Sequence, residues 1–121
     1  MPSVVFFREV DGSVPLIDWL ERLPQLARVS CFEKLELLVH FGHQLRRPHA
    51  DYLRDSIYEL RARHRGVNYR LLYFFHERQV VVVSHGIIKQ RSAVPAVEIE
   101  RALKRKQLFE ADPSEHAHRE T

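Results

Sequence analysis

The side chains with the most chemistry to offer in this sequence are arginines gathered in its middle third. Between Arg54 and Arg91 lie eight basic residues and only three acidic ones. A guanidinium group stays charged at any physiological pH, and its planar fork can bind two phosphate oxygens at once. The segment therefore predicts a polyanionic partner. On composition alone, a solvated surface whose charge is balanced elsewhere explains the same residues equally well.

Clustered cations suit one reaction on such a partner, the cleavage of RNA. This reaction needs removal of a proton from a ribose 2′-OH, stabilisation of a phosphorane and protonation of the departing 5′-oxygen. Basic side chains meet the second need directly, and a cation crowded by like charges has its pKa lowered and can exchange protons. The candidate residues for a concave basic surface are Arg54, Arg61, Arg63, Arg70, Lys89 and Arg91.

Histidine and tyrosine side chains add acid–base and stacking groups to the same segment. His85 is the best placed of the eight histidines, because it follows an apolar strand and precedes Lys89 by four residues. Its imidazole would titrate near neutrality, although a hydrogen bond at the strand end is an alternative role for it. Tyr69 and Tyr73 are candidates for stacking on a base, although such rings more often pack in a core.

The first element that must position these groups is a strand starting near Ser56, where the hydrophobic period changes from 3.6 to 2. One face of this strand should carry Tyr58, Leu60 and Ala62, and the other, open face should carry Glu59, Arg61 and Arg63. On that open face the two arginines either present their charge or pair with Glu59 and Asp55. The sequence leaves two faces for Arg70, because alternation groups it with Leu72 and a bulge would move it to the opposite face.

Turn residues and periodicity divide the remaining chain into further elements. We expect strands at 4–7, 67–75 and 80–83, and helices at about 15–23, at about 24–41 and from Pro95 through Leu103. The apolar stripe of the second helix is expected to consist of Leu26, Val29, Phe32, Leu35 and Val39. Gly42 should end that helix, and residues 43–55 are polar and predict a loop.

The order of these elements, β-α-α-β-β-β-α, predicts an α+β domain. Its last three strands should form an antiparallel meander with a helical hairpin packed on one face. A chain of 121 residues, 45% of them hydrophobic, suits a single domain, which we place at residues 1–109. The polar residues 110–121 are expected to be a disordered tail.

Several classes of protein are disfavoured by the sequence. No apolar stretch is long enough to span a membrane and the N-terminus lacks a secretory pattern, so we expect a cytoplasmic protein. The one cysteine, Cys31, has no partner for an internal disulfide and suits a buried position. His40, His43 and His49 are separated by Gly42 and Pro48 without fixed spacing, so no metal site is predicted.

Four segments, in order along the chain, carry a resemblance to a known family. They are Tyr58-Glu59-Leu60-Arg61, then Tyr69-Arg70-Leu71-Leu72-Tyr73, then Gly86-Ile87-Ile88-Lys89-Gln90, and then Pro95, Glu98, Ile99 and Ala102 of the last helix. On these motifs the chain resembles the RelE/ParE toxin superfamily, and within it the phage-derived Gp49-like or HigB-type branch.

The resemblance implies a RelE-like fold and the toxin of a type II toxin–antitoxin pair, neutralised by an antitoxin that is often a helix-turn-helix protein. It implies an endoribonuclease that cuts mRNA on the ribosome without a metal or other cofactor, and so inhibits translation. Arg61 and Arg70 would then bind the scissile phosphate, and Lys89 matches a lysine after the third meander strand. This sequence departs from the pattern at Gln90, where a second basic residue is common, and at Glu59, which is lysine in some relatives.

Two other functions fit the same fold. A ParE-like toxin inhibits DNA gyrase by binding and cleaves no RNA, and a non-catalytic RNA-binding module needs only a basic face. Arg61, Arg70 and Lys89 grouped in one place would favour cleavage. Dispersed charge and a functional C-terminal segment would favour an inhibitor of a protein.

Overall fold

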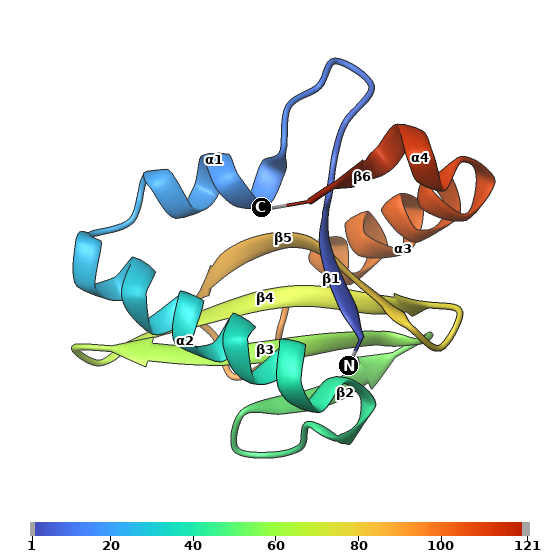
Figure 1. The fold of residues 1–121 in the computed structure, drawn as a ribbon. Helices are drawn as coiled ribbons and strands as arrows, with labels where there is room; N and C mark the ends of the chain where they lie inside the picture. Colours follow the sequence, from blue (N-terminus) through green and yellow to red (C-terminus); the bar gives the residue numbers. More distant parts are fainter. Residues whose placement is uncertain (1, 120–121) are drawn as a thin grey trace.

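A six-stranded sheet runs through the molecule, with helices on both of its faces (Figure 1). The computed structural model describes residues 2–119. The strands are β1 (Ser3–Phe7), β2 (Ala50–Arg54), β3 (Ile57–His64), β4 (Val67–His76), β5 (Val80–Lys89) and β6 (Ala117–His118). The helices are α1 (Pro15–Glu21), α2 (Gln25–Phe41), α3 (Ala96–Ala111) and α4 (Pro113–His116), with a 3-10 turn η1 (Gly42–Gln44).

The strand order is β2-β3-β4-β5-β1-β6. The expected antiparallel meander is present in β3, β4 and β5, but the sheet as a whole is mixed, because β1 lies parallel to β5. The strand β2 was missed and falls within the expected loop at residues 43–55. Its sequence ADYLR has no apolar run, and it forms a strand through antiparallel pairing with β3.

Helices cover both faces of the sheet, whereas the sequence predicted a helical hairpin on one face and no cover for the other. Helices α1 and α2 cover one face over Leu60, Leu71 and Val83, whereas α3 covers the other over Leu72 and Phe74. The central strands are apolar on both sides, so each side needs its own cover. None of the helices among residues 2–119 has the length and apolarity needed to cross a membrane.

The C-terminal residues fold against the first strand, where a disordered tail at 110–121 was expected. Helix α3 continues to Ala111, and β6 pairs antiparallel with the end of β1. The His116 ring stacks on Phe7 with ring centroids 5.0 Å apart, and the Arg8 guanidinium donates to the Glu115 carbonyl at 3.0 Å. Tertiary contacts therefore order this polar segment; residues 120 and 121 lie outside the described part of the chain.

Helix α2 turns a different face to the core than its apolar stripe suggested. Its buried residues are Ala27, Cys31, Leu35 and Leu38, whereas Leu26, Val29 and Phe32 of the expected stripe are exposed. The small side chains of Ala27 and Cys31 let this face of the helix approach the sheet closely. Burial raises the pKa of the Cys31 thiol to about 12, which makes this cysteine an inert core residue.

Helix α1 packs on the sheet through Trp19, whose ring lies directly over Gly86 of β5. A Cβ atom added at Gly86 would overlap the ring atoms of Trp19. We expect Gly86→Ala to lower the free energy of unfolding by about 1–3 kcal/mol, as measured by urea denaturation. The destabilisation caused by Gly86→Ala should be smaller in a Trp19→Leu background. Equal destabilisation in the two backgrounds would contradict this contact.

Candidate nucleic-acid interface

Three basic side chains predicted to act together lie on adjacent strands and on one face of the sheet. Arg61 of β3 is the cross-strand partner of Arg70 of β4, and Arg70 is the partner of Ile87 of β5. Lys89 lies two residues beyond Ile87 and thus on the same face. We call Arg61, Arg70 and Lys89 the basic sheet face.

A bulge in β5 brings Lys89 to this face. Leu72 pairs with His85 and Tyr73 with Val83, which leaves Ser84 as an extra residue in β5. Before the bulge, even-numbered residues such as Val82 face α3. After the bulge, odd-numbered residues such as Ile87 face α3. Without the extra residue, alternation would turn Lys89 toward the face that α1 and α2 cover.

The carboxylate of Glu59 lies between the two arginines. Arg61 Nε donates to Glu59 Oε2 at 2.8 Å, and Arg70 Nε lies 3.2 Å from Glu59 Oε1 in an ion pair without hydrogen-bond geometry. Glu59 is only 3% exposed, so the expectation that it lies on an open face was wrong. The sheet face that carries Glu59 also packs against α3, so part of this face is covered by the helix. Glu59 therefore fixes both guanidinium groups and offsets part of their charge.

Asp51 of β2 extends this network to the sheet edge. Its carboxylate accepts from Arg47 at 2.7 Å and lies 3.4 Å from Arg61 Nη2. The hydrogen bond from Arg47 holds the pKa of Asp51 below its ordinary value. Sequence reasoning missed Asp51 because β2 was expected to be loop; only the pairing of β2 with β3 brings it beside Arg61.

Arg70 is largely enclosed by the protein. It is 7% exposed, and its Nη1 donates to the Tyr69 carbonyl at 3.1 Å. Burial lowers the pKa of Arg70, whereas the nearby Glu59 carboxylate raises it. The group remains a cation at neutral pH, since arginine side chains stay protonated in proteins. Its orientation is thus set before any ligand binds.

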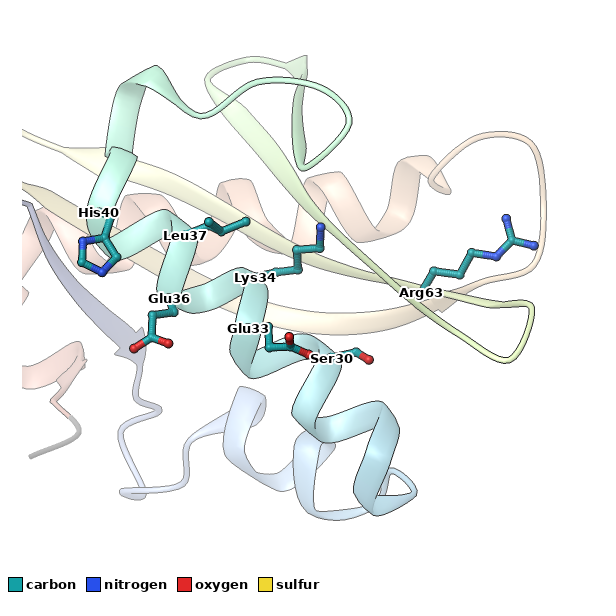
Figure 2. A pocket seen from close by; sticks show the side chains of 7 residues that line it. All are labelled: Ser30, Glu33, Lys34, Glu36, Leu37, His40 and Arg63. Carbon is teal, nitrogen blue, oxygen red and sulfur yellow. The ribbon is translucent and has the colours of Figure 1, made fainter.

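The other predicted cations are spread around this centre. Lys89 is half-buried and has no ion-pair partner within residues 2–119. Arg63 pairs in register with Asn68, but its side chain lines a pocket of about 570 Å³ beside α2 (Figure 2). Arg91 is exposed in the loop between β5 and α3. Arg54 is the last residue of β2 and forms an ion pair with Asp55. It lies beside the start of β3 and does not join the basic sheet face.

The two tyrosines predicted to stack on a base lie on the wrong face of the sheet. Alternation in β4 turns Tyr69 and Tyr73 under α1 and α2, where they are 4% and 1% exposed. Tyr69 meets Trp19 edge to face, and Tyr73 stacks on Tyr58 with centroids 5.4 Å apart. Burial raises the pKa of Tyr73 well above its ordinary value. Both are core residues.

His85 lies beneath α3 with both ring nitrogens paired. Nδ1 is 2.7 Å from Ser84 Oγ, and Nε2 is 3.0 Å from Glu98 Oε1 of α3. Burial, assisted by the nearby Arg105 cation, lowers the pKa of His85 to about 4. The imidazole is therefore neutral at pH 7 and joins β5 to α3.

The fold and this network define the class of the protein: a small α+β protein whose mixed sheet carries arginine and lysine side chains on adjacent strands. Within residues 2–119, no group of three or more histidine, cysteine or acidic side chains is arranged to hold a metal ion.

Residues 18–107 match the family described as phage derived protein Gp49-like (DUF891), and the chain belongs to this family of RelE/HigB-type toxins. A search of curated proteins finds no match. Membership of the family indicates the toxin of a toxin–antitoxin pair, with an antitoxin as its partner.

The burial of His85 predicts that acid destabilises the fold. Its pKa is about 4 in the folded protein and near 6.5 when unfolded, so the unfolded chain binds the extra proton between these values. The free energy of unfolding should fall as the pH drops from about 6.5 to about 4. His85→Gln should flatten this slope in urea titrations, whereas His40→Gln, at an exposed position of α2, should keep it. An unchanged slope in His85→Gln would contradict the assignment.

The burial of Glu59 predicts a large cost for removing its carboxylate. Glu59→Ala leaves the enclosed guanidinium of Arg70 without its counter-charge and should lower the free energy of unfolding by roughly 3 kcal/mol. The matched control is Glu110→Ala, which removes the exposed ion pair with Lys106 on α3 and should cost under about 1 kcal/mol. Similar small costs in both variants would show that Glu59 does not hold the site together.

Proposed function

We propose that this toxin is a metal-independent endoribonuclease that cuts mRNA, on the ribosome, and thereby inhibits translation. The observation that supports the proposal most is the arrangement of Arg61, Arg70 and Lys89 on three adjacent strands and one face. A phosphate placed there meets several cations at once, and positive charge fixed in advance stabilises a phosphorane most effectively.

Each side chain of the basic sheet face has its own role in this proposal. Arg61 and Lys89 are the more exposed pair and bind the phosphate that is cut. Arg70, held in orientation by Glu59 and the Tyr69 carbonyl, stabilises the charge that develops on the phosphorane. Arg63 and Arg91 bind neighbouring phosphates of the RNA.

His85 has a supporting role in the same proposal. Its ring is enclosed by α3, and both nitrogens are occupied by Ser84 and Glu98. It therefore holds β5, and with it Lys89, in place and does not transfer protons.

A second candidate function is RNA binding without cleavage. The ion pairs of Arg61 and Arg70 favour this function, because Glu59 and Asp51 offset much of the charge of the two arginines. The two candidates differ in whether the bound phosphodiester is broken, so the length of the RNA distinguishes them.

The proposal predicts discrete cuts in translated mRNA after induced expression, and in purified ribosome complexes. Arg61→Ala, Arg70→Ala and Lys89→Ala should each slow cleavage by about 100-fold or more, in line with the loss of one charge-stabilising group. Arg54→Ala removes a matched arginine from the end of β2, away from the basic sheet face, and should leave cleavage unchanged.

Three other results would overturn the proposal. Ribosome binding with intact RNA would indicate the non-catalytic module. Growth arrest with intact mRNA and inhibited DNA gyrase would indicate a ParE-like toxin. Cut products that begin with a 5′-phosphate would contradict attack by the ribose 2′-OH, which leaves a 5′-hydroxyl.

A further inference from the structure

The face of α2 that points away from the sheet is more apolar than a solvated helix surface needs to be. Leu26, Val29 and Phe32 are 56%, 46% and 47% exposed and recur every three residues along the helix. We call them the α2 stripe. Because α2 lies on the opposite side of the sheet from α3, the α2 stripe is separate from the basic sheet face (Figure 1). Of the side chains proposed to bind RNA, Arg63 is the one that lines a pocket together with α2.

A groove continues the α2 stripe toward β1. It has a volume of about 350 Å³, and most of its lining is apolar, from Val4, Phe6, Phe32, Leu35 and Val39. Glu36 and His40 of α2 complete the lining. A groove beside an exposed apolar helix stripe is the shape that accepts large side chains of a second helix. Phe32 thus joins the α2 stripe to the groove.

The surface carries two acidic side chains, Glu33 and Glu36, although the protein as a whole carries a formal charge of +3. Glu33 and Glu36 are exposed on α2, point away from β3 and have no ion-pair partner within residues 2–119 (Figure 2). The cations of Arg28 and Lys34 on α2 are directed to neighbouring segments: Arg28 donates to the Leu20 carbonyl at 3.1 Å, and Lys34 lies 2.7 Å from His49 Nδ1.

We propose that the α2 stripe and its groove bind an amphipathic helix of a partner protein, with apolar side chains on one face and lysine or arginine beside them. The apolar residues would fill the groove beside Phe32, and the basic ones would pair with Glu33 and Glu36. Family membership indicates an antitoxin partner, and the helix is assigned to it. The assignment does not depend on RNA cleavage.

Two other occupants fit this surface less well. RNA would place phosphates against the carboxylates of Glu33 and Glu36. A second copy of the chain would meet the same patch in a two-fold dimer, so these carboxylates would face their own copies.

The test uses the small proteins encoded by the reading frames on either side of this one, each co-expressed with the full chain. We expect one of them to form a complex and to protect the backbone amides of α2 from hydrogen exchange. The paired substitutions Val29→Ser with Phe32→Ser should weaken the complex by at least about tenfold, as should Glu33→Lys with Glu36→Lys. These side chains are exposed, so both double variants should remain folded.

The matched control is Glu100→Lys, an exposed charge reversal on α3, which should leave binding unchanged. Any of three results would overturn the inference: failure of both neighbouring proteins to bind, binding that the α2 variants leave intact, or a homodimer that Phe32→Ser dissociates. Because binding is measured without RNA, failure of the proposed cleavage would leave this test unaffected.

Discussion

The extra residue at Ser84 in the central strand β5 is the constraint on which the rest of the arrangement depends. Up to Val83 the strand alternates its valines between the two apolar layers. The bulge reverses the alternation, so Gly86 lies under Trp19 while Ile87 and Lys89 turn to the side of α3. One residue thus sets both how closely α1 approaches the sheet and which cations share a face.

The buried carboxylate of Glu59 gives the basic sheet face a definite geometry at the cost of some positive charge. Two guanidinium groups so close would repel each other, and the carboxylate between them removes that repulsion. Lys89, which has no ion-pair partner within residues 2–119, supplies charge that is not offset in this way. This arrangement favours a site organised before its ligand arrives.

The two sides of the sheet differ in the chemistry they present. The side of α3 carries Arg61, Arg70 and Lys89, whereas the outer surface of α2 carries apolar side chains flanked by Glu33 and Glu36. Surfaces of such opposite character suit partners of opposite charge. A toxin with this division can bind a protein on one side while its cationic side chains remain on the other.

The sequence by itself determined the alternation of β3, the meander and the family, because these depend on local periodicity and short motifs. The alternation correctly placed Leu60 and Arg61 on opposite faces of β3. The tertiary structure decided the rest: the pairing of β2 that brings in Asp51, the order of the C-terminal segment, the enclosure of His85 and the exposure of Phe32. Each depends on contacts between residues distant in the chain, and periodicity carries no information on such contacts. A glycine inside an apolar strand, Gly86, was the one local sign of the close approach of Trp19.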